Sequence, residues 1–445
     1  MRLTVPELQI AVDEGFSSEK DLFNRKQFGD RLYNLINNSN ENLVLALDAQ
    51  WGEGKSTFIK MWSSENKYKQ EPMLETIYFD AFENDYQKEP FLALASEIYE
   101  LLEDKVESKK AEFKEKAAQV FKTFSRGVIK TGIRIGTAGA IDGTMLDQAE
   151  KDLSSLVSEQ VDSLISSKFE SSKADKLALK NFKEFLSDIA INHTPGKRIV
   201  FVIDELDRCR PDFALDLLEN IKHLFSVSGV TFLLVMNRAQ LEESVKCRYG
   251  VGIDSVTYLQ KFINVWLALP RTSGQYQQDD GAKYLISSCD SMVGEGKRVN
   301  NDVTIQMLKS LVKHLKPSFR DIERILTYFA IIENSRNQSM REFYQDMMAV
   351  VCFMKVVNPR MLDAIINKRA TSEQLLDFLK LSKGSDFSED YGLEYLAIEI
   401  EFDLASDERK QEMQQNNLLN NMYGRTPNKV LEFFYNEINN IQPVT

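Results

Sequence analysis

The sequence predicts an α/β fold, with a parallel, doubly wound sheet up to about residue 270 and helices from residue 271 to the end. Three observations lead to this prediction. Buried strand candidates alternate with helical segments in the first part, and parallel strands need such crossover helices. Two of the strand candidates end in polar side chains, and the rest of the chain has helical patterning without internal repeats.

Short apolar runs with branched side chains mark the strands, because strands of a parallel sheet are buried on both faces. Helices are marked by apolar periodicity and by proline near a first turn. The predicted strands are 42–47, 76–79, 198–203 and 230–236, and a short apolar segment over 262–269 closes this part. The helices predicted between them begin at Ser56 and Pro90 and cover 211–225 and 239–249.

The charge balance excludes one class of function. The 445 residues include 55 Lys and Arg against 67 Asp and Glu, which gives a formal net charge of −12. A dominant basic field is therefore absent and we expect no general nucleic-acid binding, although a local basic patch stays open. Four separated cysteines and three histidines predict neither a zinc site nor a disulfide framework.

The N-terminal sequence and the hydropathy predict a compartment. No basic segment followed by an apolar core begins the chain, and no run reaches the roughly 18 apolar residues of a membrane-spanning helix. We therefore expect a cytoplasmic protein.

A glycine-containing loop between the first strand and its helix predicts a phosphate-binding site. Gly52 and Gly54 let the loop curl so that backbone N–H groups and a helix N-terminus face a phosphate. Lys55 is expected to reach the β- and γ-phosphates, and Ser56 to ligate Mg²⁺. Ala49 replaces the first glycine of G-x-x-x-x-G-K-[ST], which requires a negative φ or a relaxed turn there. The residues predicted to bind nucleotide are Gln50, Trp51, Gly52, Glu53, Gly54, Lys55, Ser56 and Thr57.

Acidic residues at the end of a second strand complete the predicted site. Asp204 is assigned to Mg²⁺ and Glu205 to polarising the attacking water, with Asp207 as the alternative for that role. Asn237 ends the next strand and is expected to hydrogen-bond the γ-phosphate or the lytic water. Taken alone, the loop could be a chance Gly-Lys-Ser sequence, and the acidic residues could be surface residues at the end of a strand. The two features together favour a nucleotide-binding site. Arginines near these strand ends are further candidates for phosphate contacts: Arg208, Arg210 and Arg238.

These residues resemble the KAP family of P-loop NTPases. The phosphate loop contains the Trp-Gly pair that the family favours, and the acidic strand end is close to its I-D-D-L-D-R-C segment, with Glu205 in place of the commoner Asp. The strand end near Asp80 is similar to the family's aromatic-Asn-Ala-Trp segment. The resemblance covers roughly residues 15–345. It is carried by the stretches 21–28, 47–59, 79–94, 202–211, 258–261 with 269–270, and 317–326.

The resemblance implies a three-layer P-loop NTPase domain with a helical lid, and ATP and Mg²⁺ as ligands. It implies that Arg320 is the sensor arginine of the lid, with Arg324 as the alternative, and that residues 21–28 lie against the base. The expected domains are a core over 1–270, a helical lid over 271–345 and a helical C-terminal region over 346–445. The predicted catalytic residues are Lys55, Glu205, Asp207, Asn237 and Arg320.

A long helical insert over about residues 98–190 separates the phosphate loop from the acidic strand. Many members of the family carry membrane-spanning helices there. Here the most apolar piece contains Lys130 and Arg134, each of which costs about 2.5–3.5 kcal/mol at a bilayer centre. A packed glycine-rich element is the favoured interpretation, and an element for partner binding or self-association comes second. Peripheral membrane contact through residues 120–146 comes last.

The functional prediction is an Mg²⁺-dependent ATP-binding and ATP-hydrolysing switch or remodelling ATPase. ATP rather than GTP rests on the resemblance and on the lack of an N-K-x-D motif. The protein would act on a partner or effector on another chain, and the resemblance favours bacterial defence against phage as the context. A nucleotide-stabilised binding scaffold with negligible turnover is the alternative, and a small-molecule kinase is a third option. A homo-oligomer stays open, because an arginine from a neighbour can complete such a site.

Overall fold

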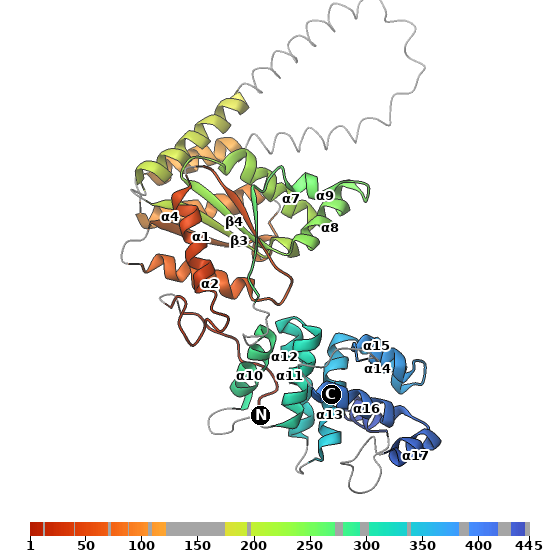
Figure 1. Cartoon of the computed structure of the whole chain (residues 1–445). Coiled ribbons are helices and arrows are strands. Elements are labelled where there is room, and N and C mark those ends of the chain that lie inside the picture. The colour runs from red at the N-terminus through yellow and green to blue at the C-terminus, as the bar shows by residue number, and fades with distance from the viewer. Residues whose placement is uncertain are drawn as a thin grey trace, which may run out of the picture.

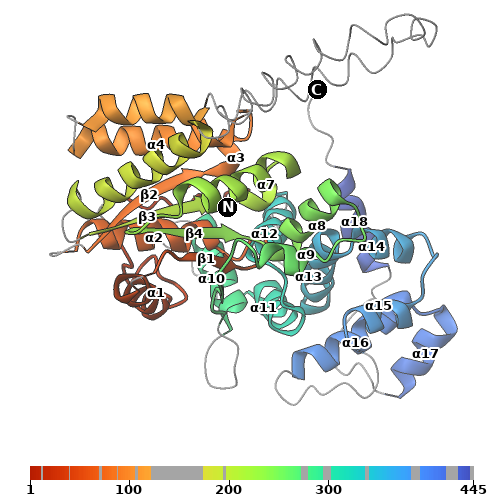
Figure 2. The same ribbon diagram turned by 90° about the horizontal axis from the view of Figure 1, so that it is seen from above.

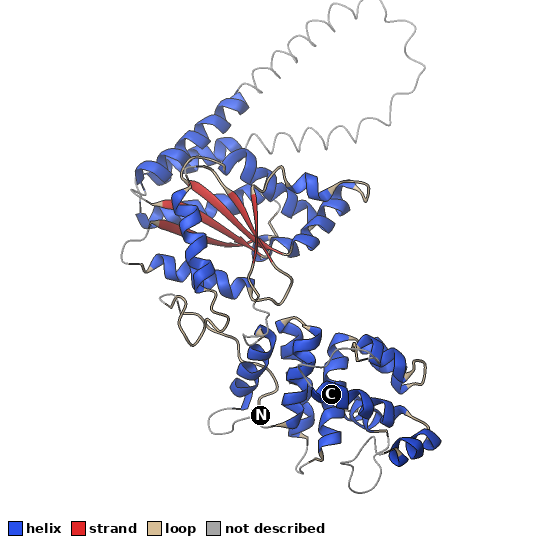
Figure 3. Cartoon of the chain, viewed as in Figure 1, coloured by secondary structure: helices blue, strands red, loops and turns tan. Residues whose placement is uncertain are grey.

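The protein folds into an α/β part, which holds all the described strands, and a part built from helices (Figures 1 and 3). The structure is a computed structural model. It describes residues 1–11, 14–39, 41–69, 73–87, 89–105, 109–121, 174–193, 197–271, 279–293, 302–335, 340–381, 391–416 and 429–440.

One sheet of five strands organises the α/β part, and every pairing in it is parallel. The strands follow in the spatial order β2 (Leu74–Asp80), β3 (Arg198–Asp204), β4 (Val230–Met236), β1 (Val44–Asp48) and β5 (Val265–Ala268). All residues of β4 are buried, as are all but the first of β3, which is why both are mostly apolar in sequence. β4 therefore separates the strand that leads into the phosphate loop from the strand that ends at Asp204.

Helices cover both faces of this sheet, so the α/β part has three layers (Figure 2). One face packs against α1 (Lys26–Asn38) and α2 (Lys55–Lys67), and the other against α4 (Pro90–Lys105), α7 (Pro211–Asn220) and α8 (Arg238–Tyr249). Successive residues of β1 alternate between the two cores: Val44 and Ala46 belong to one, and Leu45 and Leu47 to the other. The predicted α/β fold with its parallel sheet is confirmed.

Several short elements escaped the hydrophobic pattern because they are too short to show a period. They are α3 (Ala81–Asn84), α9 (Ser255–Leu259) and the helical turns η1 (Ile189–His193), η2 (Leu206–Arg208) and η3 (Ile221–Phe225). The last of these is a π-helical continuation of α7, so the helix expected over 211–225 changes its hydrogen bonding at Ile221. Asp80 caps α3 by accepting a hydrogen bond from the backbone N–H of Glu83, at 3.0 Å.

The two ends of the predicted insert are helical and pack onto the sheet. Residues 109–121 and 174–188 are helical, and Phe113 and Phe182 contact each other with ring centroids 5.9 Å apart. Both rings join the core cluster that contains α4 and α7. Residues 122–173 lie outside the described residues. The predicted membrane or partner contact through 120–146 falls almost wholly on them and stays a prediction.

The helical part has one continuous core. Its helices are α10 (Asp280–Val293), α11 (Val303–Leu315), α12 (Phe319–Asn334), α13 (Glu342–Val357), α14 (Pro359–Ile366), α15 (Ser372–Phe378), α16 (Tyr391–Leu404), α17 (Asp407–Gln415) and α18 (Val430–Asn439). α13 lies at the centre, with every residue from Met347 to Met354 buried, as expected for a helix that is apolar all round. The core runs from Leu285 to Ile438, across the boundary predicted at residue 345. None of the helices that the structure describes is both long and apolar enough to cross a membrane.

The N-terminal segment lies along the helical part before it enters the α/β part (Figure 1). The backbone N–H of Arg2 donates to the carbonyl of Met292 at 2.8 Å, and Phe23 packs against the helical core. Asp21 then accepts a hydrogen bond from the backbone N–H of Arg25, at 2.8 Å, just before α1. This route brings Arg25 beneath the phosphate loop.

Candidate functional site

The phosphate loop joins the end of β1 to the first turn of α2. Gly52 and Gly54 have φ angles of 80° and 75°, a region that strains any residue with a Cβ atom. Gly54 is the last residue before α2 and adopts the left-handed conformation. Ala49 is not among the non-glycine residues with positive φ in the described chain, so the condition for replacing the first glycine of the pattern is met.

The Lys55 ammonium folds back onto its own loop. It donates to the backbone carbonyls of Ala49 at 2.7 Å and of Gln50 at 3.0 Å. The side chain is only 8% exposed, and this burial lowers its pKa, while carboxylates at the end of β3, Asp207 foremost, act in the opposite direction. To reach a phosphate, the ammonium must leave these two carbonyls.

Asp204 is the most enclosed acid of the site. It is 0% exposed, and it accepts hydrogen bonds from the Tyr78 hydroxyl at 2.9 Å and from the backbone N–H of Glu205 at 2.8 Å. Burial raises the pKa of Asp204, and the neighbouring hydroxyls of Ser56 and Tyr78 act against that rise. The two predicted Mg²⁺ ligands, Ser56 and Asp204, thus lie next to each other.

Glu205 lies beside this pair with its backbone in the left-handed region, at φ 60° and ψ 22°. Its carboxylate accepts a hydrogen bond from the Ser56 hydroxyl at 3.3 Å and forms an ion pair with Arg208. Burial raises the pKa of Glu205, Arg208 lowers it, and Asp204 raises it further. A carboxylate with a raised pKa next to the metal ligands suits acceptance of a proton from water.

Asp207, the alternative candidate for water activation, is engaged with the phosphate loop. It is buried, and the indole N–H of Trp51 donates to its carboxylate. Trp51 itself is 41% exposed. Glu205 thus contacts Ser56, whereas Asp207 contacts Trp51 of the phosphate loop.

Asn237 follows β4 and lies between the loop and the acids. The sheet register pairs Asp48 with Met236 and Asp204 with Val235, so all three strand ends lie level. The side-chain oxygen of Asn237 caps α8 by accepting from the backbone N–H of Ala239 at 3.1 Å. Its NH₂ group makes no hydrogen bond within the part of the chain that the structure describes.

The other predicted arginines near these strand ends have partners of their own. Arg210 forms an ion pair with Asp85, and Arg238 forms one with Glu242, at 2.7 Å. Of these arginines, Arg208 alone is placed against a predicted catalytic residue, Glu205.

The lid reaches the phosphate loop through the first turn of α12. The backbone N–H of Phe319 donates to the carbonyl of Gly52 at 3.1 Å. A Cβ atom on Gly52 would lie 2.9 Å from the Cβ atom of Arg320, so only glycine fits this contact. Arg320 is exposed, and its guanidinium is without an ion pair among the described residues. Arg324, the alternative, is exposed one turn further along α12.

Three residues of this region were missed by sequence reasoning: Tyr78, Arg25 and Arg271. Tyr78 has a signal in hindsight, because it lies in the strand next to β3 and two residues before its end. Arg25 lies within the stretch 21–28, but nothing in the local sequence marks its contact with the phosphate loop. Arg271 follows Pro270, where β5 has ended, and nothing in the local sequence marks it.

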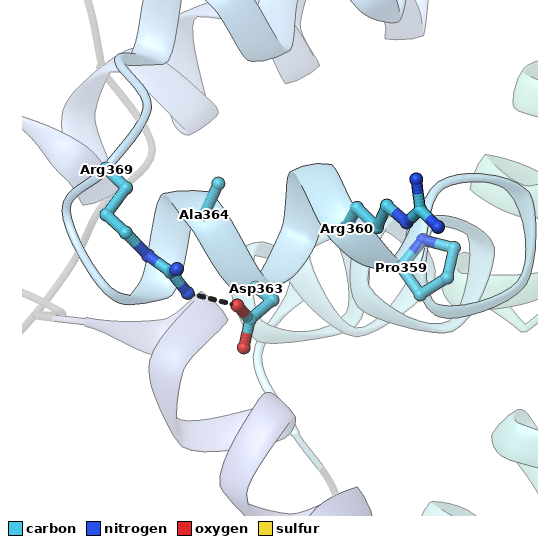
Figure 4. Close-up of a pocket in the computed structure, with 5 residues that line it drawn as sticks. All are labelled: Pro359, Arg360, Asp363, Ala364 and Arg369. Atoms are coloured by element: carbon cyan, nitrogen blue, oxygen red, sulfur yellow. Dashed lines mark hydrogen bonds and ion pairs between the residues drawn. The ribbon is translucent and has the colours of Figure 1, made fainter.

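A pocket of about 430 Å³ lies elsewhere, on α14 of the helical part (Figure 4). Its lining residues are Pro359, Arg360, Asp363, Ala364 and Arg369. Arg369 is paired with Asp363, and the Tyr435 hydroxyl donates to the same carboxylate at 2.9 Å. These contacts fix α14 against α18.

The residues present fit a nucleotide with Mg²⁺. Mg²⁺ takes hard oxygen ligands and is commonly held by one or two protein groups together with phosphate oxygens and water. The Ser56 hydroxyl, at the first turn of α2, and the Asp204 carboxylate, at the end of β3, supply such oxygens side by side. The positive φ angles of Gly52 and Gly54 shape the loop in front of that helix N-terminus, where an anion is stabilised.

Comparison with known proteins adds the following. No curated protein matches the chain. Among solved structures, the chain is similar to the Aeropyrum pernix ORC2 protein in its ADPNP–ADP complexes, at 13% identity and a TM-score of 0.38, over 98% of this chain and 89% of that one. It is also similar to Cdc6p from Pyrobaculum aerophilum, at 12% identity and a TM-score of 0.39, over 97% and 98%. At these TM-scores the likeness carries no argument about function.

One protein family matches most of the chain. Residues 25–370 match the family described as the KAP family P-loop domain. The matched range begins at Arg25 and contains the phosphate loop, the acidic end of β3 and the whole of α12. The chain therefore belongs to the KAP family of P-loop domains.

Proposed function

We propose that this protein is an Mg²⁺-dependent, ATP-binding and ATP-hydrolysing switch that acts on a partner protein. Membership in a P-loop NTPase family supports nucleotide binding. The observation that carries the proposal of hydrolysis is the Ser56 hydroxyl, which donates to the Glu205 carboxylate at 3.3 Å and lies next to the Asp204 carboxylate, whose pKa it lowers. This one side chain joins the phosphate loop to the acids expected to act on Mg²⁺ and on water.

Each group of the site has a defined task in this proposal. Lys55 moves from the loop carbonyls to the β- and γ-phosphates, where its charge offsets theirs. Ser56 and Asp204 hold Mg²⁺, which neutralises charge on the phosphates when it is bound. Glu205 accepts a proton from the attacking water, and the NH₂ group of Asn237 orients that water or the γ-phosphate.

The switch is proposed to work through the lid. Arg320 lies at the junction of the phosphate loop and α12, so its contact with phosphate would depend on whether ATP or ADP fills the loop. The output would be assembly with, or control of, a partner or effector on another chain. The proposed context, defence against phage in the bacterial cytoplasm, rests on the family resemblance alone.

Phosphate release with Mg·ATP over a range of protein concentrations tests this function. The wild type is compared with Lys55→Ala and Glu205→Gln, and with Lys60→Ala, an exposed lysine on the same helix, as a matched control. We expect the first two substitutions to lower kcat by about 100-fold or more and the control to retain turnover. A rate that rises faster than linearly with protein concentration would indicate that a second copy completes the site.

The alternative outcome identifies the binding scaffold. In that case ATP binds tightly, Lys55→Ala alone removes the binding, and no turnover is measured at any protein concentration. ATP hydrolysis that survives Glu205→Gln at the wild-type rate would contradict the role proposed for Glu205.

A further inference from the structure

Arg271 joins the phosphate loop to the lid through one guanidinium. Its Nη1 donates to the Glu53 carboxylate at 2.9 Å, and its Nη2 donates to the backbone carbonyl of Pro317 at 3.2 Å. Glu53 belongs to the loop, and Pro317 lies two residues before α12 begins. The planar fork of an arginine is suited to holding two acceptors at once in fixed geometry.

Arg25, which lies before the phosphate loop in the sequence, holds the same loop residue. It is 3% exposed, and it donates from Nη1 to the backbone carbonyl of Glu53 at 3.0 Å and from Nε to that of Pro270 at 3.2 Å. Burial lowers the pKa of Arg25 to about 10, while Asp280 at the start of α10 acts in the opposite direction. Glu53 is thus fixed at both its main chain and its side chain by charged groups.

Aromatic packing makes this junction stiff. Phe23 stacks on Phe319 with ring centroids 4.6 Å apart and planes inclined by 9°. The Arg25 guanidinium lies over Phe23 at 4.7 Å, and that of Arg271 lies over Phe319 at 5.4 Å. A displacement of Glu53 would therefore be passed to the first turn of α12 rather than absorbed by loose side chains.

The loop must rearrange when it binds a phosphate. Lys55 now occupies the carbonyls of Ala49 and Gln50, and these contacts must break when the ammonium turns to a phosphate. We propose that Arg271 is a positioning residue that transmits this rearrangement to Arg320, so that filling the phosphate loop sets the placement of the lid. The inference rests on the proposed function, because it requires that the loop bind nucleotide.

Hydrogen–deuterium exchange of the 445-residue chain, with and without a non-hydrolysable ATP analogue and Mg²⁺, tests the coupling. One peptide covers the loop and α2, 49–62, and one covers the start of α12, 315–330. Arg271→Ala is compared with Arg248→Ala, a matched control in which another arginine bridges a carboxylate, Asp216, and a backbone carbonyl, that of Asp212. In the wild type and in Arg248→Ala, we expect nucleotide to slow exchange in both peptides.

Arg271→Ala should separate the two responses: the loop peptide still responds, and the change in the α12 peptide falls by about fivefold or more. An undiminished α12 response would overturn the inference. If neither peptide responds in the wild type, the proposed function fails at nucleotide binding, and the inference falls with it. Arg271→Lys keeps the charge opposite Glu53, and so should fold, but lacks the fork that reaches Pro317, and it should show the same separation.

Turnover gives a second, independent readout. Arg271→Ala should lower kcat by about 10- to 100-fold and change the KM for ATP little, because it acts through Arg320 and not on the nucleotide. The double variant Arg271→Ala with Arg320→Ala should then be no slower than Arg320→Ala alone, within about twofold. Losses that multiply in the double variant would show that the two arginines act independently and would overturn the inference.

Discussion

Glu205 combines a strained backbone with a crowded carboxylate. Its φ of 60° is one that residues with a side chain rarely adopt, and such strain collects at functional sites. The conformation turns the carboxylate toward Ser56 and leaves it paired with Arg208. In the state described here, the proposed base is therefore held by two neighbours, and its charge depends on both of them.

The pH dependence of turnover is the residue-scale prediction. Glu205 can accept a proton only when it is ionised, and burial raises its pKa, so kcat should fall on the acid side at a higher pH than for an ordinary glutamate. Arg208 lowers this pKa, so Arg208→Ala should move the acid limb of the kcat profile to still higher pH. The measurement is kcat against pH at saturating Mg·ATP.

Arg210→Ala is the control for this shift, because Arg210 pairs with Asp85 and not with Glu205. Its acid limb should coincide with that of the wild type. An acid limb that stays in place in Arg208→Ala would show that Glu205 is not the group whose ionisation limits turnover.

Single residues of the site divide into those that local sequence reveals and those that it does not. Gly52, Gly54, Lys55 and Ser56 act within one loop and one helix turn, so their spacing along the chain predicts their geometry. Arg271 acts on a loop 218 residues away from it, and no local pattern records such a contact.

At the scale of elements, α12 owes its first turn to a capping box. The Ser318 hydroxyl accepts from the backbone N–H of Asp321 at 3.2 Å, and the Asp321 carboxylate accepts from the backbone N–H of Ser318 at 3.3 Å. This box holds Phe319 and Arg320 against Gly52. The N-terminus of α12 is thus tied both to its own cap and to the phosphate loop.

Ser318→Ala is predicted to lower both stability and turnover. Loss of such a cap costs about 1 kcal/mol, which corresponds to a fall of about 2–4 °C in Tm. Because the same turn carries Arg320, kcat should fall as well. Circular dichroism melts and phosphate release measure the two effects.

Ser406→Ala removes an equivalent cap from α17, where the Ser406 hydroxyl accepts from the backbone N–H of Arg409 at 3.3 Å. It should cost similar stability and leave kcat unchanged. If both variants lower kcat equally, the effect of Ser318 is one of general stability and not of lid placement.

Element prediction succeeded where burial imposes a pattern and failed where it does not. The apolar runs of β3 and β4 follow directly from burial on both faces. α3 has four residues and depends on a single cap from Asp80, so it has no periodicity to detect. The π-helical turn at Ile221 follows from local hydrogen bonding that amphipathicity does not record.

For the molecule as a whole, the helical part depends on burial that includes ionisable groups. Asp346 of α13 and Glu399 of α16 are both buried, and their carboxyl groups interact with each other. Burial raises the pKa of both carboxyls, and the neighbouring Glu342 raises them further. The folded protein thus keeps protons on this pair that the unfolded chain releases above about pH 4.

The sign of the pH dependence follows from these protons. A carboxyl with a raised pKa in the folded state binds its proton more tightly there than in the unfolded chain. Its effect on stability is therefore most favourable in acid, where both states are protonated. The free energy of unfolding then declines as the pH rises toward and through the raised pKa values. We therefore expect the free energy of unfolding to fall between about pH 4 and about pH 9. Glu399→Gln offers Asp346 a hydrogen-bonding partner and removes one ionisable group, so this fall should become shallower, with a gain of about 1–2 kcal/mol at the alkaline end. Urea unfolding at a series of pH values measures the slope, with Glu394→Gln, an exposed glutamate on the same helix, as the control that should keep the wild-type slope. An equal slope in Glu399→Gln and wild type would show that the buried pair does not shape the stability of the helical part.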